Sequence, residues 1–493
     1  MNSPSAPMGR RGERLDLLKK FGWTSLASVF QMMTGILSVV VLTRFLTPTD
    51  YGLFGLAIIA IAPGEALANG PFSSQLEQKS EISDADINSV FWANLAIALV
   101  AAAIILPLAG LIAHRSALPE AVPVIWAATG FMVLSAAGVV PIALLRRRQM
   151  FRAVSQINVT AAGIGLAAAI GLALAGTGVW ALVGFEAVRR VVILVTSYAK
   201  ARWLPNGGFS MAHFRAMLPF TTGVLMGQLV GRADALAPRA AAAIFLGPAG
   251  LGLLSVAIRV ADQIQSFVAT PIGAMALPVL SSAAGDRSRL YAIMADAWRM
   301  ISITSFPMLV GLAAVAPIFL PVAVGEKFAD VGPVAAIILL ANMRIVTSRV
   351  NITATQAVGK AYMASASIAV SFVAHVVLLA LLARYGIVWI AVAVLLRSFI
   401  TWPIAGWIVK ATTGFGMMRQ ARIMAPPFLA SLIMGGCVVE LGALLGKALS
   451  PFVTTGVLVV AGTLIYALSI YLVDPWVRRA APRFLKHLRE RYA

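Results

Sequence analysis

Long apolar runs recur along almost the whole of this sequence, separated by short polar segments. Each run has roughly 20 residues, the length that an α-helix needs to cross a hydrocarbon core of about 30 Å. Hydrophobic residues make up 60% of the chain and charged residues 12%, against about 45–50% and about 25% in globular proteins. We therefore expect an all-α polytopic membrane protein without a sizeable soluble domain.

The runs divide best into fourteen transmembrane helices. Six are expected at about 22–44, 51–76, 89–113, 121–145, 154–175 and 179–199. Six more are expected at about 218–241, 251–277, 298–320, 332–355, 362–383 and 388–409, and a last pair at about 423–446 and 452–474.

One segment occurs twice, 200 residues apart. Thr43–Ile58 reads TRFLTPTDYGLFGLAI, and Ala243–Ile258 reads AIFLGPAGLGLLSVAI. The identical residues are Phe45, Leu46, Pro48, Gly52, Leu53, Ala57 and Ile58 in the first copy, and Phe245, Leu246, Pro248, Gly252, Leu253, Ala257 and Ile258 in the second. Because the copies lie six spans apart, an even number, the sequence predicts two parallel six-helix lobes plus a C-terminal helix pair.

A weaker echo supports the repeat. Gly178-Val179-Trp180-Ala181 opens the sixth span, and Gly386-Ile387-Val388-Trp389 opens the twelfth. The expected organisation is then a basic N-terminus at 1–21, an N-lobe at 22–199, an inter-lobe linker at 200–217, a C-lobe at 218–409, spans thirteen and fourteen at 423–474, and a basic tail at 475–493.

The basic residues predict the orientation of these helices. With the N-terminus and alternate loops assigned to the cytoplasm, that side holds 26 of the 39 Lys and Arg residues and the opposite side only five. Such a bias follows the positive-inside rule, so both termini are expected in the cytoplasm. The rule also explains most of the net charge of +20, and we expect no nucleic-acid partner.

Eight arginines fall inside the predicted spans. A charge at a helix centre costs about 2.5–3.5 kcal/mol on insertion scales, so these side chains should face water, an ion-pair partner or a ligand. A guanidinium forms bidentate hydrogen bonds with phosphate or carboxylate and keeps its charge. As substrate-binding candidates in a cationic cavity between the lobes, we select Arg189, Arg190, Arg232, Arg259, Arg344, Arg349 and Arg397, whereas the eighth is Arg239.

Acidic residues inside the spans are candidates for ion coupling: Glu65, Glu186, Asp234 and Asp262. Glu186 precedes Arg189 and Arg190 by three and four residues, and Arg259 precedes Asp262 by three, so these groups can pair on one helix face. The alternative to a binding role is that the arginines form ion pairs that hold helices together.

Motifs of soluble enzymes are absent from the sequence. It contains no G-x-x-x-x-G-K-[ST] phosphate loop, so ATP hydrolysis is not expected. His114, His213, His375 and His487 are scattered without metal-ligand spacing, and Cys437 is the only cysteine. We expect no cofactor, with H⁺ or Na⁺ as the coupling ion.

The sequence around the repeat resembles a known family. The segments that carry the resemblance are Arg44–Ala57, Phe91-Trp-Ala-Asn-Leu, Phe245–Arg259, Leu277-Pro-Val-Leu-Ser and Gly325-Glu-Lys-Phe. They are similar to the Wzx-type O-antigen and exopolysaccharide flippases, in the polysaccharide transporter branch of the multidrug/oligosaccharidyl-lipid/polysaccharide exporter superfamily. The resemblance covers about residues 15–410.

The resemblance implies transport of an undecaprenyl-diphosphate-linked oligosaccharide across the bacterial inner membrane, by alternating access, for exopolysaccharide, capsule or O-antigen synthesis. It also implies contact with membrane lipid and with polysaccharide polymerase and chain-length or export proteins. A lipid II flippase of the same superfamily would have the same fold.

Two other functions fit the sequence less well. A cation or drug antiporter of that superfamily favours an acidic cavity, whereas this chain has more arginines than acids in its spans. A membrane-embedded polymerase or glycosyltransferase needs a large polar loop, and the longest interior loop here, about 200–217, is short. We therefore expect a transporter.

Overall fold

The computed structural model describes residues 29–479 except 70, 80, 116, 117, 282, 284 and 447. All regular structure in these residues is helical, in accord with the predicted all-α class. The basic N-terminus expected at 1–21 and most of the tail expected at 475–493 lie outside the described residues.

The chain divides into two compact units. The first comprises Ala60–Leu229 with the described residues up to Ser38, and the second comprises Val39–Ile59 and Val230–Ala493, as far as the latter is described. Three of the described helices therefore contribute to both units. The helix Val29–Phe45 passes from the first to the second, α2 from the second to the first, and α8 from the first to the second.

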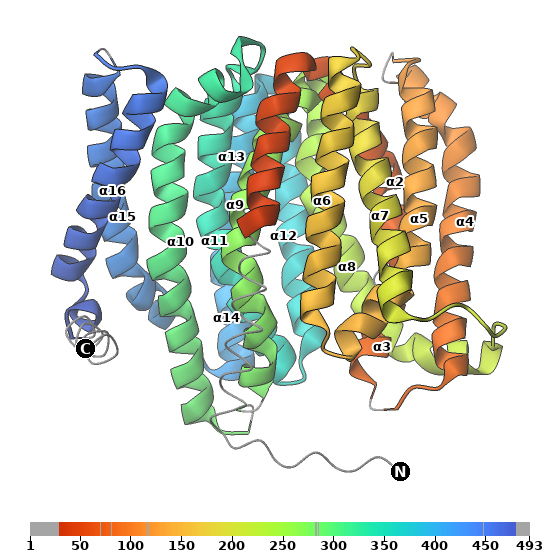
Figure 1. Cartoon of the computed structure of the whole chain (residues 1–493). Coiled ribbons are helices and arrows are strands. Elements are labelled where there is room, and N and C mark those ends of the chain that lie inside the picture. The colour runs from red at the N-terminus through yellow and green to blue at the C-terminus, as the bar shows by residue number, and fades with distance from the viewer. Residues whose placement is uncertain are drawn as a thin grey trace, which may run out of the picture. The chain divides into compact units, whose positions relative to one another are not determined.

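The first unit is a bundle of long helices. In it, α5 contacts α4, α6 and α7, and α6 packs along α7 (Figure 1). The short α3 lies against α5 and α4. The bounds are α2 Pro48–Asn69, α3 Pro71–Gln78, α4 Asp84–Arg115, α5 Ala121–Arg147, α6 Phe151–Leu174 and α7 Trp180–Ala201.

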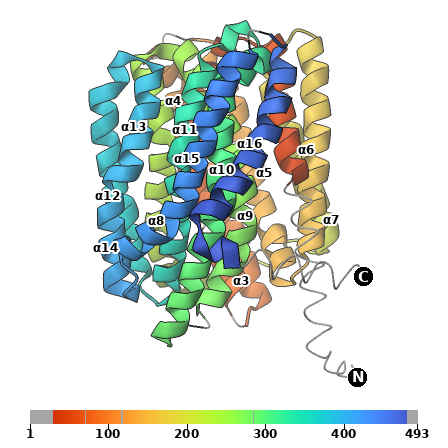
Figure 2. The ribbon, with the colours of Figure 1, turned by 90° about the vertical axis from the view of Figure 1, so that its left-hand side faces the viewer.

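The second unit is larger. Its centre is the contact of α10 and α11, with α9 against α11 and the terminal pair α15 and α16 against α10, whereas α12, α13 and α14 contact one another (Figure 2). The bounds are α8 Met211–Phe245, α9 Gly247–Ser281, α10 Arg287–Val324, α11 Val331–Ala357, α12 Ala361–Leu382, α13 Ile387–Ile400, α14 Trp402–Thr413, α15 Met417–Leu445 and α16 Pro451–Val473. Two short 3-10 turns, Glu326–Phe328 and Ala383–Tyr385, precede α11 and α13.

Each of the fourteen predicted spans contains helix in the described residues. Ten helical segments are long and apolar enough to cross a membrane. The helix Val29–Phe45 is apolar but shorter in its described part. The chain is thus a multi-pass membrane protein, while the count of fourteen crossings stays a prediction.

Two predicted spans are interrupted. The span expected at 51–76 ends as a helix at Asn69, and the short α3 follows it. The span expected at 388–409 is divided at Thr401 into α13 and α14. Pro403 explains the second break, because its ring occupies the space of the carbonyl four residues earlier and it has no N–H to donate.

The two copies of the sequence repeat pack against each other within the second unit. A Cβ atom placed on Gly52 would overlap the carbonyl group of Pro248, and one placed on Gly252 would overlap that of Pro48. The contact is reciprocal, as for two elements related by a twofold axis. Glycine is required at both positions because the helix backbones approach too closely for any side chain.

The two copies start their helices differently. In the first, the Thr47 hydroxyl donates to Asp50 Oδ2 at 2.7 Å and accepts from the Asp50 amide at 3.2 Å. The Thr47 amide also donates to Asp50 Oδ2, at 2.8 Å, which completes a capping box. In the second, Gly247 has a φ of +68° directly before Pro248.

The weaker echo also corresponds to a common structure. Gly178 has a φ of +59° before α7, and Gly386 has a φ of +120° before α13. Positive φ values of this kind favour glycine over residues with a side chain, so both turns depend on the glycine that the sequence repeats.

The segment predicted as a linker at 200–217 is largely structured. Its last residues belong to α8, which begins at Met211, and its loop is held on α4. The backbone amide of Asn206 donates to Asn88 Oδ1 at 3.2 Å, and Trp92 Nε1 donates to the backbone carbonyl of Gly207 at 2.9 Å. In the described residues, this segment is thus part of the first unit and does not act as a free tether.

Candidate functional site

Each unit contains a cluster of charged side chains inside its helix bundle, next to a cavity. The clusters centre on Arg190 of α7 and on Asp234 of α8. Burying charges is unfavourable unless they are paired and hydrogen-bonded, so such clusters in membrane helices mark functional sites or strong structural links.

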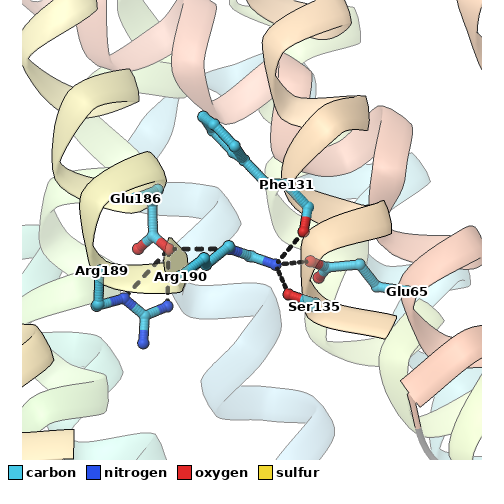
Figure 3. A network of polar contacts seen from close by, with 6 residues as sticks. All are labelled: Glu65, Phe131, Ser135, Glu186, Arg189 and Arg190. Atoms are coloured by element: carbon cyan, nitrogen blue, oxygen red, sulfur yellow. Dashed lines mark hydrogen bonds and ion pairs between the residues drawn. The ribbon is translucent and has the colours of Figure 1, made fainter. Parts of the chain in front are cut away.

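In the first unit, Arg190 joins three helices (Figure 3). Its Nη1 atom donates to Glu65 Oε1 of α2 at 2.5 Å, to the Phe131 carbonyl of α5 at 3.3 Å, and to the hydroxyl of Ser135, also on α5. Its Nε atom donates to Glu186 Oε2 at 3.3 Å, one turn earlier on α7. The Arg190 and Glu65 side chains are only 12% and 17% exposed, so this pair is largely withdrawn from solvent.

Arg189 extends the same network. Its Nη2 atom donates to Glu186 Oε2 at 2.7 Å, so one carboxylate oxygen accepts from two guanidinium groups. This confirms the pairing that the three- and four-residue spacing predicted. Figure 3 shows the Arg189 guanidinium pointing away from Glu65, so the two arginines face different sides of Glu186.

A cavity of about 320 Å³ adjoins this network. Its charged lining residues are nearly balanced: Glu65, Glu77, Arg146, Arg189 and Arg190. Arg146 and Glu77 form a further pair at 3.4 Å, but both are more exposed than the Arg190 pair. The first cavity is therefore polar without a strong excess of either charge.

In the second unit, Asp234 of α8 accepts from two other helices. Arg397 Nη1 of α13 donates to Asp234 Oδ2 at 2.5 Å, and His375 Nδ1 of α12 lies 2.8 Å from Asp234 Oδ1. Arg397 Nη1 also donates to the hydroxyl of Ser371 at 3.2 Å. Both oxygens of this carboxylate are thus engaged by basic groups.

This cluster lies on the wall of a cavity of about 390 Å³. Its charged lining residues are Asp234, Arg344, Arg349 and Arg397, so the cavity has a clear cationic excess. Hydroxyl and amide groups complete the polar lining: Ser348, Asn351, Thr355, Ser367, Ser371, Ser398 and Thr401.

The structure divides the predicted site residues among separate places. Arg189, Arg190, Glu65 and Glu186 form the first cluster, whereas Arg344, Arg349, Arg397 and Asp234 line the second cavity. The described lining of neither cavity includes Arg232 or Arg259. Arg232 is exposed on α8. The substrate-binding and ion-coupling roles of all these residues stay predictions.

Asp262 has a partner that the sequence did not indicate. Arg239 Nη2 of α8 lies 3.8 Å from Asp262 Oδ2 of α9. The two residues are 23 positions apart, so no helical spacing could have predicted the contact. The pairing of Arg259 with Asp262 stays a prediction.

Sequence reasoning also missed residues that complete the clusters, namely His375, Ser135 and Ser371. A histidine inside an apolar span was an available signal, because ionisable groups at membrane depth are rare and usually paired. The serines gave none. No group of three or more His, Cys, Asp or Glu side chains suited to a metal ion occurs among the described residues.

Comparison with known proteins identifies the family. A family described as "Polysaccharide biosynthesis protein" matches residues 41–333, which is more than half of the chain. The chain belongs to this polysaccharide biosynthesis protein family. The matched region contains α2 to α10, both copies of the repeat, and Arg190 and Asp234, the centres of the two clusters.

Two curated proteins are similar to this chain. The succinoglycan biosynthesis transport protein ExoT of Rhizobium meliloti (strain 1021) is 26% identical over 322 residues, which is 65% of each chain. The lipopolysaccharide biosynthesis protein WzxC of Escherichia coli (strain K12) is 22% identical over 325 residues, covering 65% of this chain and 66% of that protein. The similarity thus spans slightly less than two thirds of either relative.

Solved structures establish the fold. The lipid II flippase MurJ in an inward closed conformation superimposes with a TM-score of 0.74 at 14% identity, covering 93% of this chain and 99% of that one. A multidrug resistance MATE family transporter of the MOP superfamily, in an inward-facing conformation, gives a TM-score of 0.56 at 16% identity, covering 79% and 99%. This chain therefore has the fold of these transporters.

Proposed function

We propose that this protein is a flippase that moves undecaprenyl-diphosphate-linked oligosaccharide units across the bacterial inner membrane, for exopolysaccharide, capsule or O-antigen synthesis. The observation that carries the proposal is the cavity with three arginines and one aspartate inside a membrane-spanning unit. Arginine retains its charge at membrane depth and binds phosphate or carboxylate bidentately, so a cationic cavity suits an anionic glycolipid.

The family membership supports the proposal. Two similar proteins carry names from succinoglycan transport and lipopolysaccharide synthesis. Flippase action is transport without bond chemistry, in accord with a sequence that lacks a phosphate loop. Alternating access would expose the arginines to each side of the membrane in turn.

The proposal includes the setting of the protein. Both termini lie in the cytoplasm, on the basis of the loop charges. The partners are the lipid-linked oligosaccharide, membrane lipid, and polysaccharide polymerase and chain-length or export proteins. The coupling ion is H⁺ or Na⁺, with Glu65, Glu186, Asp234 and Asp262 as the candidate carboxylates.

A second candidate is a lipid II flippase, because the TM-score to the lipid II flippase MurJ is 0.74. A cation antiporter is not favoured, because the second cavity has an excess of arginines. Depletion of the protein distinguishes the two flippases: loss of peptidoglycan and cell lysis indicate lipid II, whereas loss of one surface polysaccharide in viable cells indicates the proposed substrate.

Replacing Arg189, Arg190 and Arg397 tests the proposed function in cells. Changing each singly to Gln should abolish polysaccharide export, scored per amount of protein that each variant retains in the membrane. Arg422→Gln, an exposed site on α15, is the matched control and should export normally. Normal export from a variant with all three changes would contradict the assigned role of these arginines.

A further inference from the structure

We infer that the cavity among α8, α11, α12, α13 and α14 binds a single acidic sugar residue, one that carries a carboxylate or a phosphate. This rests on the proposed function and adds to it. The cavity would select the acidic residue of the oligosaccharide, separately from whichever groups hold the lipid diphosphate. The inference depends on three features: an uncompensated arginine, a hydroxyl-rich wall and a small volume.

The uncompensated arginine is Arg344 of α11. Its side chain is buried, with 4% of the residue exposed. In the described part of the chain, its polar contacts are a hydrogen bond to the Thr347 hydroxyl at 3.2 Å and a ring contact, with Cζ 5.1 Å from the Trp402 centroid. Its Nε atom has no hydrogen-bond partner there.

A buried guanidinium without a carboxylate is strongly unfavourable by itself. The first cluster shows the usual solution, because Arg190 is held between Glu65 and Glu186. In the second unit, Asp234 is already engaged by Arg397 and His375. Arg349 interacts electrostatically with Asp262 of α9, so it is Arg344 that gives the cavity a positive charge for an anionic ligand to balance.

The remaining wall suits sugar hydroxyls. The hydroxyls of Ser348, Thr355 and Thr401 each donate to a backbone carbonyl three or four residues earlier, which leaves their oxygen lone pairs as acceptors. The buried Asn351 Oδ1 is a further acceptor without a partner in the described residues. A bare phosphate would use the arginines but not these acceptors, whereas a sugar would use both.

The size limits the ligand. A cavity of about 390 Å³ lies at the low end of small-molecule sites. It has room for one monosaccharide residue beside the arginines, and the rest of an oligosaccharide unit would lie outside it. Apolar residues Ile345, Ile352, Ile368, Ile408 and Val409 cover the rest of the lining and can contact the faces of a sugar ring.

The test measures binding to the purified full-length protein in detergent, by the shift of its thermal unfolding midpoint. The probes are glucuronate and glucose 6-phosphate as acidic sugars, glucose as the neutral sugar, and inorganic pyrophosphate as the lipid-diphosphate mimic. We expect both acidic sugars to raise the midpoint at concentrations where glucose and pyrophosphate do not.

Three variants locate the binding. Arg344→Gln should weaken acidic-sugar binding at least tenfold, Arg344→Lys should weaken it less, and Arg422→Gln on the exposed surface should leave it unchanged. Ser367→Leu, which fills the cavity without changing a charge, should also remove binding and covers the case in which Arg344→Gln fails to fold.

Different results would contradict the site, its selectivity for sugar, and the inference as a whole. Equal shifts with glucose and glucuronate, or an undiminished shift in both Arg344→Gln and Ser367→Leu, would overturn the site. Equal binding of pyrophosphate would overturn its selectivity for sugar. Loss of polysaccharide export on depletion of the protein, combined with no acidic-sugar binding, would refute this inference while leaving the flippase function intact.

Discussion

At the scale of single residues, the two arginine clusters differ in how their charge is compensated. Arg190 contacts two carboxylates, and Arg189 shares one of them. Arg397 contacts a single carboxylate that it shares with His375. The first cluster therefore joins three helices as well as lining a cavity, and the second lines a cavity with a larger excess of arginines.

The Arg190–Glu65 pair should contribute strongly to stability. Arg190→Gln leaves Glu65 largely buried without its cation, and we expect a loss of about 3–5 kcal/mol in the free energy of unfolding. Adding Glu65→Gln should restore part of that loss, because the unpaired carboxylate is then neutral. Chemical unfolding in detergent measures both variants and their coupling.

The control for this double-mutant comparison is Arg146→Gln, which removes the more exposed ion pair with Glu77. That change should lower the free energy of unfolding by no more than about 1 kcal/mol. Additive effects of Arg190→Gln and Glu65→Gln would show that the two side chains do not interact.

Gly52 and Gly252 define the contact between the two copies of the repeat. Gly52→Ala and Gly252→Ala each place a methyl group against a proline carbonyl. Each should lower the free energy of unfolding by about 1–3 kcal/mol or more through overpacking. Gly130→Ala is the matched control, since a Cβ there meets no atom within 4 Å.

Because the two glycines contact each other's segments, their effects should be less than additive in the double variant. If Gly52→Ala and Gly252→Ala matched the Gly130→Ala control, the close approach of α2 and α9 would be wrong.

At the scale of elements, the sequence predicted helices better than it predicted where they end. Apolar runs locate every bundle helix, because each must bury its backbone hydrogen bonds within the helix. The division of α13 from α14 depends on one proline in an otherwise apolar run. The loop at 203–210 looked like a linker, because its anchors on Asn88 and Trp92 are more than 110 residues away.

The N-terminus of α10 offers a pH-dependent test. Asp286 caps this helix, and hydrogen bonds from the Ser288 hydroxyl, and then from the amides of Arg289 and Ser288, hold the pKa of its carboxyl below the usual value. The lowered pKa means that the cap contributes fully above about pH 4, the unfolded value, and is lost as the pH falls through the folded value.

Asp286→Ala should therefore lower the thermal midpoint at pH 7, with a difference from wild type that shrinks as the pH falls below about 4. Asp286→Asn keeps an uncharged cap and should remain near wild type at neutral pH. A wild-type advantage over Asp286→Ala that grew on acidification would contradict the assigned sign.

The pairs between distant residues account for most of what could not be predicted about the sites. Glu186 with Arg189 and Arg190 follows from helical spacing, and the structure confirms it. Asp234 with His375 and Arg397 joins residues 141 and 163 positions apart, and only the packing of three helices brings them together. The presence of charged residues inside apolar spans indicated that these side chains are important. It did not indicate which of them would contact one another.

At the scale of the whole molecule, the internal repeat and the composition predicted the fold class correctly. The TM-score of 0.74 to the lipid II flippase MurJ and the family match over residues 41–333 agree with that class. The sequence identity to this flippase is only 14%, so the substrate has to be inferred from the chemistry of the cavities. The central claim is therefore that this fold moves a lipid-linked oligosaccharide across a membrane.

The most direct test reconstitutes the purified protein in liposomes that contain a fluorescent undecaprenyl-diphosphate-linked oligosaccharide. A membrane-impermeant reagent that quenches or cleaves the exposed glycan then reports how fast substrate from the inner leaflet becomes accessible. We predict that the protein accelerates this step many-fold over protein-free liposomes, and that the variant with Arg189, Arg190 and Arg397 all changed to Gln does not. Equal rates with and without the wild-type protein would contradict the flippase function.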